Sequence, residues 1–243
     1  MQDLFIVIIF ILLLVLFYIH LSKIFTIEDI LNHYLEARGG PDRLQLIDSL
    51  QMDGVKKMAG HEILFRITKV KSKLFHALYQ VGDQYSGVIV RPGRGWKFSS
   101  EEYDLAPLSA GQVNDLRGEM DMFGPLINHK EKGYKLFYEG KEWVTERLCY
   151  RVRLKSNDGN AGFYFIDTKT HLLLQSRTQS ATLEGSMSGS YEIVHHFLEY
   201  REFGGILFPA LILNESVRES FSLYFQHIAL NAEVAEGLYG PEE

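Results

Sequence analysis

The first pattern in the chain after its apolar N-terminus is helical. Between residues 27 and 47 apolar side chains recur three and four positions apart, the spacing of one face of an amphipathic helix. Thr26 stands at the cap position of this helix, with Asp29 three residues on, as in a capping box. The Gly39–Gly40 pair would end the helix, and Pro41 suits the first position of a second, short one. The apolar stripe of the two helices consists of Ile27, Ile30, Leu31, Tyr34, Leu35, Leu44 and Ile47.

After Gly54 the hydrophobic period changes from 3.6 to two. Ile63, Phe65 and Ile67 alternate with polar residues, and residues 148–154 alternate in the same way, which is typical of strands with one buried face. Turn residues follow about every ten positions. Beyond the start of a strand at Leu50, the pattern predicts about eleven strands, at residues 61–69, 74–81, 85–90, 95–98, 134–138, 148–154, 163–167, 172–176, 190–200, 206–214 and 221–230.

One further helix interrupts the strands. Ser109 would cap a helix over residues 108–122, and Gly124–Pro125 would end it. With no linker and no internal repeat, residues 27–243 predict a single α+β domain with a long antiparallel sheet. So many strands in one open sheet would curl strongly. We therefore expect a curled sheet with the helix pair as a lid on its concave face.

The N-terminus has a different character. Leu4 to Ile19 is an unbroken run of 16 apolar residues, and with His20–Leu21 it would span about 27 Å as a helix, close to the hydrocarbon thickness of a bilayer. It lacks the basic start and the small-residue cleavage site of a signal peptide. Residues 1–23 are thus predicted to be a hydrophobic membrane anchor, with an atypical export signal as the alternative.

Composition and motifs argue against nucleic-acid binding and against catalysis. A net charge of −6 does not provide the basic face that nucleic acid requires, and the single cysteine, Cys149, excludes an internal disulfide. Gly185–Gly189 has methionine where a nucleophile elbow needs serine, and His195 and His196 point to opposite faces of one strand. We expect a protein that is not an enzyme and has no metal or cofactor; a hydrolase using His195 or Ser188 is a minor alternative.

Large apolar side chains are the remaining signal. The chain has 16 Phe, 13 Tyr and 2 Trp, and a curled sheet offers more inward positions than a short helix pair can cover. A concave apolar cavity is the general form of a ligand site, and an acyl chain gains about 0.8 kcal/mol per buried CH₂. The candidate lining residues are Ile63, Phe65, Ile67, Trp96, Tyr150 and Val152.

Several short motifs follow one another along residues 27–243. They are residues 34–40 with 44–54, Gly95–Trp96, Phe123–Leu126, Tyr164–Asp167 with 170–174, Glu199–Arg201 with 205–209, and Leu230–Asn231 with 238–241. In this order they resemble the periplasmic outer-membrane lipoprotein-sorting (LolA/LolB-like) superfamily, in particular its uncharacterised bacterial branch. The resemblance implies a half-open antiparallel barrel whose lid helices cover an apolar cavity for acyl chains.

This resemblance carries functional expectations. It implies non-enzymatic binding or transfer of lipid or lipoprotein acyl chains in the bacterial envelope, by a protein anchored in the inner membrane and facing the periplasm, or periplasmic after export. It also implies a ligand-gating arginine, for which Arg38 and Arg66 are the candidates. The alternative is an envelope structural or interaction module with a cavity filled by side chains. The lid residues would be Ile30, Leu31, Tyr34, Leu35, Leu44 and Ile47.

Overall fold

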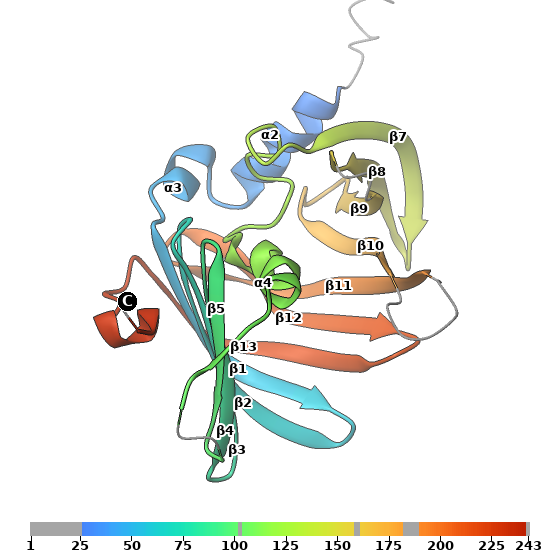
Figure 1. Cartoon of the computed structure of the whole chain (residues 1–243). Helices are drawn as coiled ribbons and strands as arrows, with labels where there is room; N and C mark the ends of the chain where they lie inside the picture. The colour runs from blue at the N-terminus through green and yellow to red at the C-terminus, as the bar shows by residue number, and fades with distance from the viewer. Residues whose placement is uncertain (1–25, 102–103, 158–160, 182–189, 242–243) are drawn as a thin grey trace, which may run out of the picture.

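A single antiparallel sheet of thirteen strands organises the described part of the chain, in the order β6-β5-β4-β3-β2-β1-β13-β12-β11-β10-β9-β8-β7. The computed structural model describes residues 26–101, 104–157, 161–181 and 190–241 (Figure 1). The strands are β1 (Ser49–Met58), β2 (His61–Val70), β3 (Leu74–Val81), β4 (Gln84–Arg91), β5 (Arg94–Ser99), β6 (Ala106–Pro107), β7 (Lys135–Val144), β8 (Arg147–Lys155), β9 (Ala161–Asp167), β10 (Leu173–Ala181), β11 (Ser190–Phe203), β12 (Ile206–Ser216) and β13 (Ser220–Leu230).

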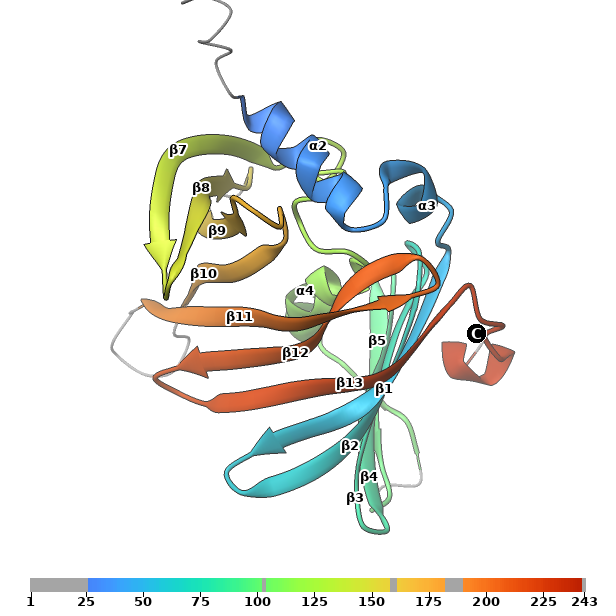
Figure 2. The same ribbon diagram turned by 180° about the vertical axis from the view of Figure 1, so that it is seen from behind.

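The sheet curls strongly, as the strand count predicted. In Figures 1 and 2, β1–β5 form one wall, β7–β10 form the opposite wall, and β11–β13 connect the two. The sheet begins at β6 and ends at β7, so these are its two edges. The expected count of eleven strands was low, because β1 runs on to Met58 and the two-residue β6 has no recognisable pattern.

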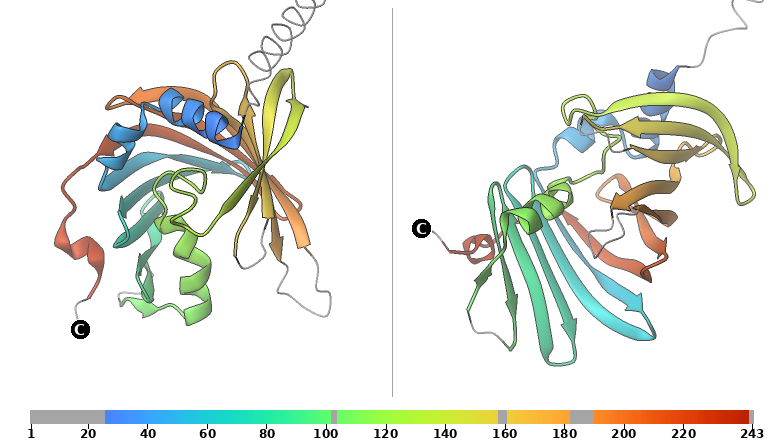
Figure 3. Two further views of the ribbon diagram at one scale, coloured as in Figure 1. Left: turned by 90° about the horizontal axis from the view of Figure 1, so that it is seen from above. Right: turned by 45° about the vertical axis from the view of Figure 1, so that its right-hand side comes forward.

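Helices α2 (Ile27–Ala37) and α3 (Pro41–Gln45) lie across one end of the curled sheet (Figure 3). The capping box of Thr26 and Asp29 is present, and Pro41 occupies the first position of α3, as predicted. Gly39 has a φ of 123°, and a Cβ there would lie 2.3 Å from the Gly205 carbonyl oxygen. Glycine is therefore required both for the turn and for the close approach of the β11–β12 turn.

The helix expected at 108–122 is shorter than predicted. It consists of α4 (Ala110–Leu116), capped by Ser109, and the 3₁₀ turn η1 (Arg117–Met120). This unit lies on the concave side of the sheet beside β3–β5 (Figures 1 and 3). Residues 121–134, which we call the crossing segment, then lead across the concave face to β7.

Two predictions concern residues that the structure does not describe. The hydrophobic segment 1–23 and the Gly185–Gly189 loop, with Ser188, both lie outside the described residues. Within the ranges that are described, none of the helices has the length and apolar character needed to cross a membrane.

Candidate ligand-binding face

The concave face of the sheet has two parts. We call the part beneath α2 and α3 the covered half and the part beyond it, where several side chains are only partly buried, the open half. At the end closed by α2 and α3, helix and sheet side chains merge into one core. Its buried members include Ile30, Leu31, Tyr34, Leu44 and Ile47 from the helices, Leu126 and Ile127 from the crossing segment, and Met52, Phe65, Tyr150, Val152, Ile166, Ile206 and Phe225 from the sheet.

Arg38 fastens α2 to the sheet. Its side chain is only 5% exposed. The guanidinium donates to the Leu207 carbonyl at 2.5 Å and to the Tyr34 hydroxyl at 2.8 Å, and it lies 5.3 Å from the centre of the Phe208 ring. The backbone N–H of Leu207 also donates to the Arg38 carbonyl at 2.9 Å. Arg38 therefore lies inside the closed end and connects α2 to β12.

The other arginine candidate is placed differently. Arg66 is exposed and pairs with Asp53 at 2.6 Å. Because Phe65 is buried in the core, strand alternation points its neighbour Arg66 away from the concave face. Of the two candidate arginines, only Arg38 therefore faces the interior of the curled sheet.

The predicted lining residues fall into three groups. Phe65, Tyr150 and Val152 are buried in the covered core, while Ile63 and Ile67 share the face of Phe65 but are only partly buried. Trp96 lies on the opposite face. A Cβ on Gly240 would lie 3.4 Å from the Trp96 ring, so the C-terminal segment covers it from outside.

The reason for the misplacement of Trp96 is strand register. Gly95 pairs with Val90 and faces α4, since a Cβ on Gly95 would meet Leu108 and Val113. The next residue, Trp96, must therefore face outward. An aromatic residue in a short strand does not reveal which face the sheet buries.

The predicted lid residues all belong to the covered core or pack against it. They close one end of the curled sheet and do not cover its whole concave face. Ile30 is fully buried, Tyr34 is 2% exposed, and Leu35 is only partly buried. In this half the side chains of the helices, the crossing segment and the sheet pack against one another.

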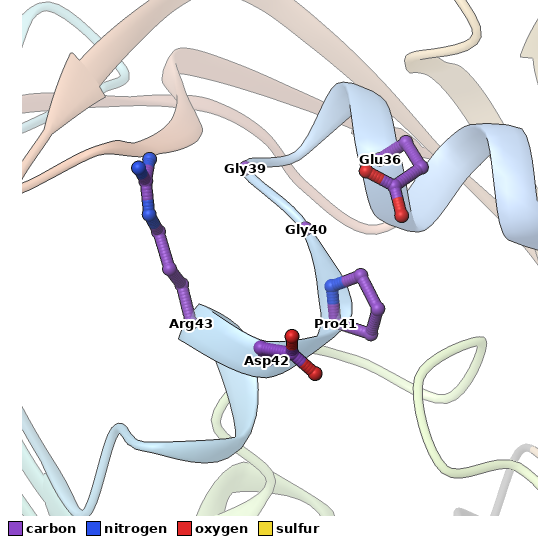
Figure 4. A pocket seen from close by; sticks show the side chains of 6 residues that line it. All are labelled: Glu36, Gly39, Gly40, Pro41, Asp42 and Arg43. Atoms are coloured by element: carbon purple, nitrogen blue, oxygen red, sulfur yellow. The ribbon is translucent and has the colours of Figure 1, made fainter.

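The pocket at the α2–α3 junction has a volume of about 420 Å³ and a mixed, largely polar lining (Figure 4). Ligand sites are usually lined by apolar side chains, and an acyl chain requires such a lining. This pocket is therefore not an acyl-chain site. Its lining residues are Glu36, Gly39, Gly40, Pro41, Asp42 and Arg43.

The open half lies toward the β1–β2 and β12–β13 turns, away from α2 (Figures 1 and 2). Here side chains on the concave face form cross-strand rows. In the row that we call the apolar row, Ile63 pairs with Lys56, Lys56 with Leu223, Leu223 with Ile212 and Ile212 with Phe197. All five side chains are partly buried. Four of them are apolar, and Lys56 on β1 interrupts the row between Ile63 and Leu223. Leu223, Ile212 and Phe197 also pack against the edge of the covered core.

The next row toward the turns, which we call the polar row, contains two hydrogen-bonding side chains. His195 pairs with Asn214, Asn214 with Phe221 and Phe221 with Met58. Asn214 Nδ2 lies 3.0 Å from His195 Nε2. Burial lowers the pKa of His195, although the charge of Glu119 opposes this. His196 points outward, with Nε2 3.5 Å from Glu215, so the prediction that the two histidines face opposite sides is confirmed.

Charged groups also border the crossing segment. Lys69 donates to the Asp121 carbonyl at 2.9 Å, and its burial lowers the pKa of the ammonium despite the nearby Glu119 and Asp121. Lys132 donates to both carboxylate oxygens of Asp121 at 2.7 Å. Lys69 on β2 thus holds the start of the segment against the sheet, and Lys132 connects the two ends of the segment to each other.

Catalytic signals are weak among these groups. Within the described ranges no cluster of three metal-ligating side chains occurs. Burial raises the pKa of the Cys149 thiol to about 11, which fits an inert core thiol rather than a nucleophile. The absence of enzymatic activity therefore stays a prediction.

Known proteins resemble this chain in fold. No protein-family model and no curated protein matches the sequence. Three crystal structures cover nearly the whole described fold. A DUF1329 family protein from Desulfovibrio piger aligns with a TM-score of 0.58 at 12% identity, over 88% of this chain and 97% of that one.

Two further crystal structures align equally well, and the name of one of them refers to lipoprotein sorting. A LolA superfamily protein from Nitrosomonas europaea aligns with a TM-score of 0.57 at 11% identity, over 89% of this chain and 98% of that one. A protein domain assigned to outer-membrane lipoprotein sorting, from Vibrio parahaemolyticus, aligns with a TM-score of 0.57 at 11% identity, over 87% and 95%. This chain therefore has the LolA-like fold that the order of its sequence motifs predicted.

Proposed function

We propose that this protein binds acyl chains of lipids or lipoproteins on the concave face of its sheet, without chemical conversion of the ligand. The apolar row carries this proposal. Leu223, Ile212 and Phe197 form a continuous apolar run on three neighbouring strands, and Ile63 lies on the other side of Lys56; all four apolar side chains are only partly buried. Its curved, apolar surface suits a flexible hydrocarbon chain better than a rigid polar substrate.

Hydrocarbon burial can supply the binding energy. At about 0.8 kcal/mol per buried CH₂, eight methylenes would contribute roughly 6 kcal/mol before the cost of ordering the chain. That corresponds to a dissociation constant between micromolar and millimolar, and a second chain or a polar contact would tighten it. Few polar contacts are therefore needed.

The covered half suggests how a longer chain would be accommodated. Ile30 and Tyr34 of α2 and Leu126 and Ile127 of the crossing segment occupy the apolar surface next to the apolar row. A chain extending from the open half would compete with them for Phe65 and Phe225. In the proposed mechanism the ligand enters at the open half and displaces these side chains, and Arg38 sets the cost of releasing α2.

The setting we propose is the bacterial envelope, on the periplasmic side. The support is the LolA-like fold together with the name of one structural neighbour, which refers to lipoprotein sorting. The partner would be a membrane lipid or an acylated lipoprotein. A membrane anchor at residues 1–23 belongs to the same proposal.

Ile63 and Leu64 offer a matched test of the proposed face. They are neighbours on β2, but Ile63 lies in the apolar row, whereas Leu64 faces outward and is 54% exposed. We expect Ile63→Asp to weaken binding of a fluorescent fatty acid about tenfold or more, since it places a charge on apolar surface. Leu64→Asp should leave binding unchanged.

Native mass spectrometry of the purified protein provides the second readout. Co-purifying lipid that is lost in Ile63→Asp and retained in Leu64→Asp would support the proposal. If the wild-type protein carries no lipid and also fails to bind the added fatty acid, acyl binding is wrong.

The runner-up is an envelope interaction module without a lipid ligand. The observation that favours it is the covered half, in which α2, α3 and the crossing segment form one core with the sheet. Under this alternative, hydrogen exchange in α2 would stay unchanged when lipid is added at any concentration. Under the leading proposal, a long-chain ligand would accelerate exchange in α2.

A further inference from the structure

We propose that the preferred ligand carries its acyl chain on a secondary amide, and that this amide binds between Asn214 of the polar row and Lys56 of the apolar row. This inference rests on the proposed function and adds the chemical class of the ligand. An N-acylated amine, such as the acylated terminus of a peptide, belongs to this class. Free fatty acids and ester-linked chains do not.

Asn214 provides the first half of the site. Its side chain is 6% exposed and shares the concave face with Ile212 of the apolar row. Its Nδ2 group donates to His195 Nε2, whereas its Oδ1 atom has no hydrogen-bond partner. Burying an amide oxygen unpaired is unfavourable, because it has lost its hydrogen bonds to water. The oxygen is therefore an acceptor available to a donor on a ligand.

A neutral His195 is compatible with this orientation of the amide. Burial lowers the pKa of the imidazole, and a neutral ring with its proton on Nδ1 accepts a hydrogen bond at Nε2. With Nδ2 of Asn214 used in this bond, Oδ1 is the atom left for a ligand.

Lys56 provides the second half. Its ammonium lies 4.0 Å from the centre of the Phe221 ring, and Phe221 is the register partner of Asn214. Within the described part of the chain Lys56 has no ion-pair partner. A hydrogen-bond acceptor and a cationic donor thus border the same aromatic ring, directly beside the apolar row.

A secondary amide matches this pair of groups. Its N–H can donate to Asn214 Oδ1, and its carbonyl oxygen can accept from the Lys56 ammonium. A carboxylate at neutral pH has only acceptors and would leave Asn214 Oδ1 unpaired, and an ester lacks the donor as well. The site therefore distinguishes an amide-linked chain from the other two.

Access to Asn214 requires movement, because its Oδ1 atom is shielded from solvent in this closed form. The 3₁₀ turn η1 packs against β3 on the concave side. The charge of Glu119 on η1 raises the pKa of both Tyr79 on β3 and His195 on β11. A ligand that displaces η1 and the crossing segment would expose the polar row at the same time as the neighbouring core.

The test compares four ligands with one saturated chain: the N-methyl amide, the N,N-dimethyl amide, the methyl ester and the carboxylate. Each displaces a fluorescent acyl probe from the wild-type protein. We expect the N-methyl amide to bind about tenfold more tightly than the dimethyl amide, because only the former has an N–H for Asn214. This comparison needs no variant, so it does not depend on how a mutant folds.

Variants assign the effect to residues. Asn214→Leu should abolish the preference for the N-methyl over the dimethyl amide and leave ester binding within about twofold. Lys56→Met should weaken binding of both amides. Lys57→Met is the control, since Lys57 is exposed, lies on the other face of β1 and pairs with Glu62 of β2.

Failure of this inference is distinguishable from failure of the proposed function. Equal affinities for the four ligands, or tightest binding of the carboxylate, would overturn the amide site while acyl binding stands. If none of the four displaces the probe or binds directly, both proposals are wrong.

Discussion

Arg38 is the residue on which the closed form depends most directly. Its guanidinium connects α2 to the backbone of β12, and it is almost completely buried. A buried cation without an ion pair persists only where hydrogen bonds and ring faces replace water. Here the Leu207 carbonyl, the Tyr34 hydroxyl and the Phe208 ring serve that role. The sequence motif ending in Gly39–Gly40 brings the arginine to this position.

Arg38→Met should lower the free energy of unfolding by about 2–3 kcal/mol, because it leaves the Leu207 carbonyl and the Tyr34 hydroxyl without their donor. Chemical denaturation measures this. Arg66→Met is the control, and its exposed pair with Asp53 should be worth at most about 1 kcal/mol. Equal losses for the two variants would contradict the role assigned to Arg38.

At the scale of elements, α2 combines a strong local signal with a tertiary role that the signal does not specify. Its capping box and apolar stripe predict an amphipathic helix that needs a partner surface. The structure supplies the partner at the end of the sheet, beside the β11–β12 turn. His33 of α2 also stacks on His171 of the β9–β10 turn, with ring centres 4.7 Å apart.

Ile30→Ala tests how firmly α2 is docked. Ile30 is fully buried, so removing its side chain should cost about 2–4 kcal/mol of unfolding free energy and speed amide exchange in residues 27–37. Leu46→Ala, at a position that is 71% exposed, should cost less than about 0.5 kcal/mol. Unchanged exchange in the Ile30 variant would show that α2 is held by its polar contacts alone.

For the whole molecule, the distribution of histidines makes stability depend on pH. Burial lowers the pKa of His76, His195 and His171; the neighbouring His33 contributes to the last shift, and Asp167 opposes it. These groups bind protons more readily in the unfolded chain, whose histidine pKa is 6.5. Their neutral form therefore supports folding above that pH, and the contribution is lost as the pH falls through the lower folded values.

We expect the midpoint of thermal unfolding to fall as the pH drops below 6.5, because the unfolded chain then binds protons that these buried histidines bind less readily in the folded protein. His76→Gln should reduce this acid dependence, whereas His227→Gln, at an exposed position, should not. Scanning calorimetry across this range measures both. A stability that rises on acidification would contradict the sign of the shifts.

Local sequence determined a large part of the architecture. The caps and the glycine pair of α2, Pro41 of α3, the Ser109 cap of α4 and most strand positions follow from interactions within a few residues, and the order of motifs identified the fold. The strand count also predicted a curled sheet. These features are local or additive, so a single sequence expresses them.

Tertiary structure alone decided which side chains meet. The pairing of β1 with β13 joins strands far apart in the chain and places Lys56, Leu223 and Ile212 in one row. Asn214, His195 and Phe221 come from three strands, so no spacing in the sequence reveals their contact. Trp96 shows the same limit, because a shift of one residue exchanges the faces of a strand. Alternation determines that a strand has a buried side, but long-range register determines which side it is and what it faces.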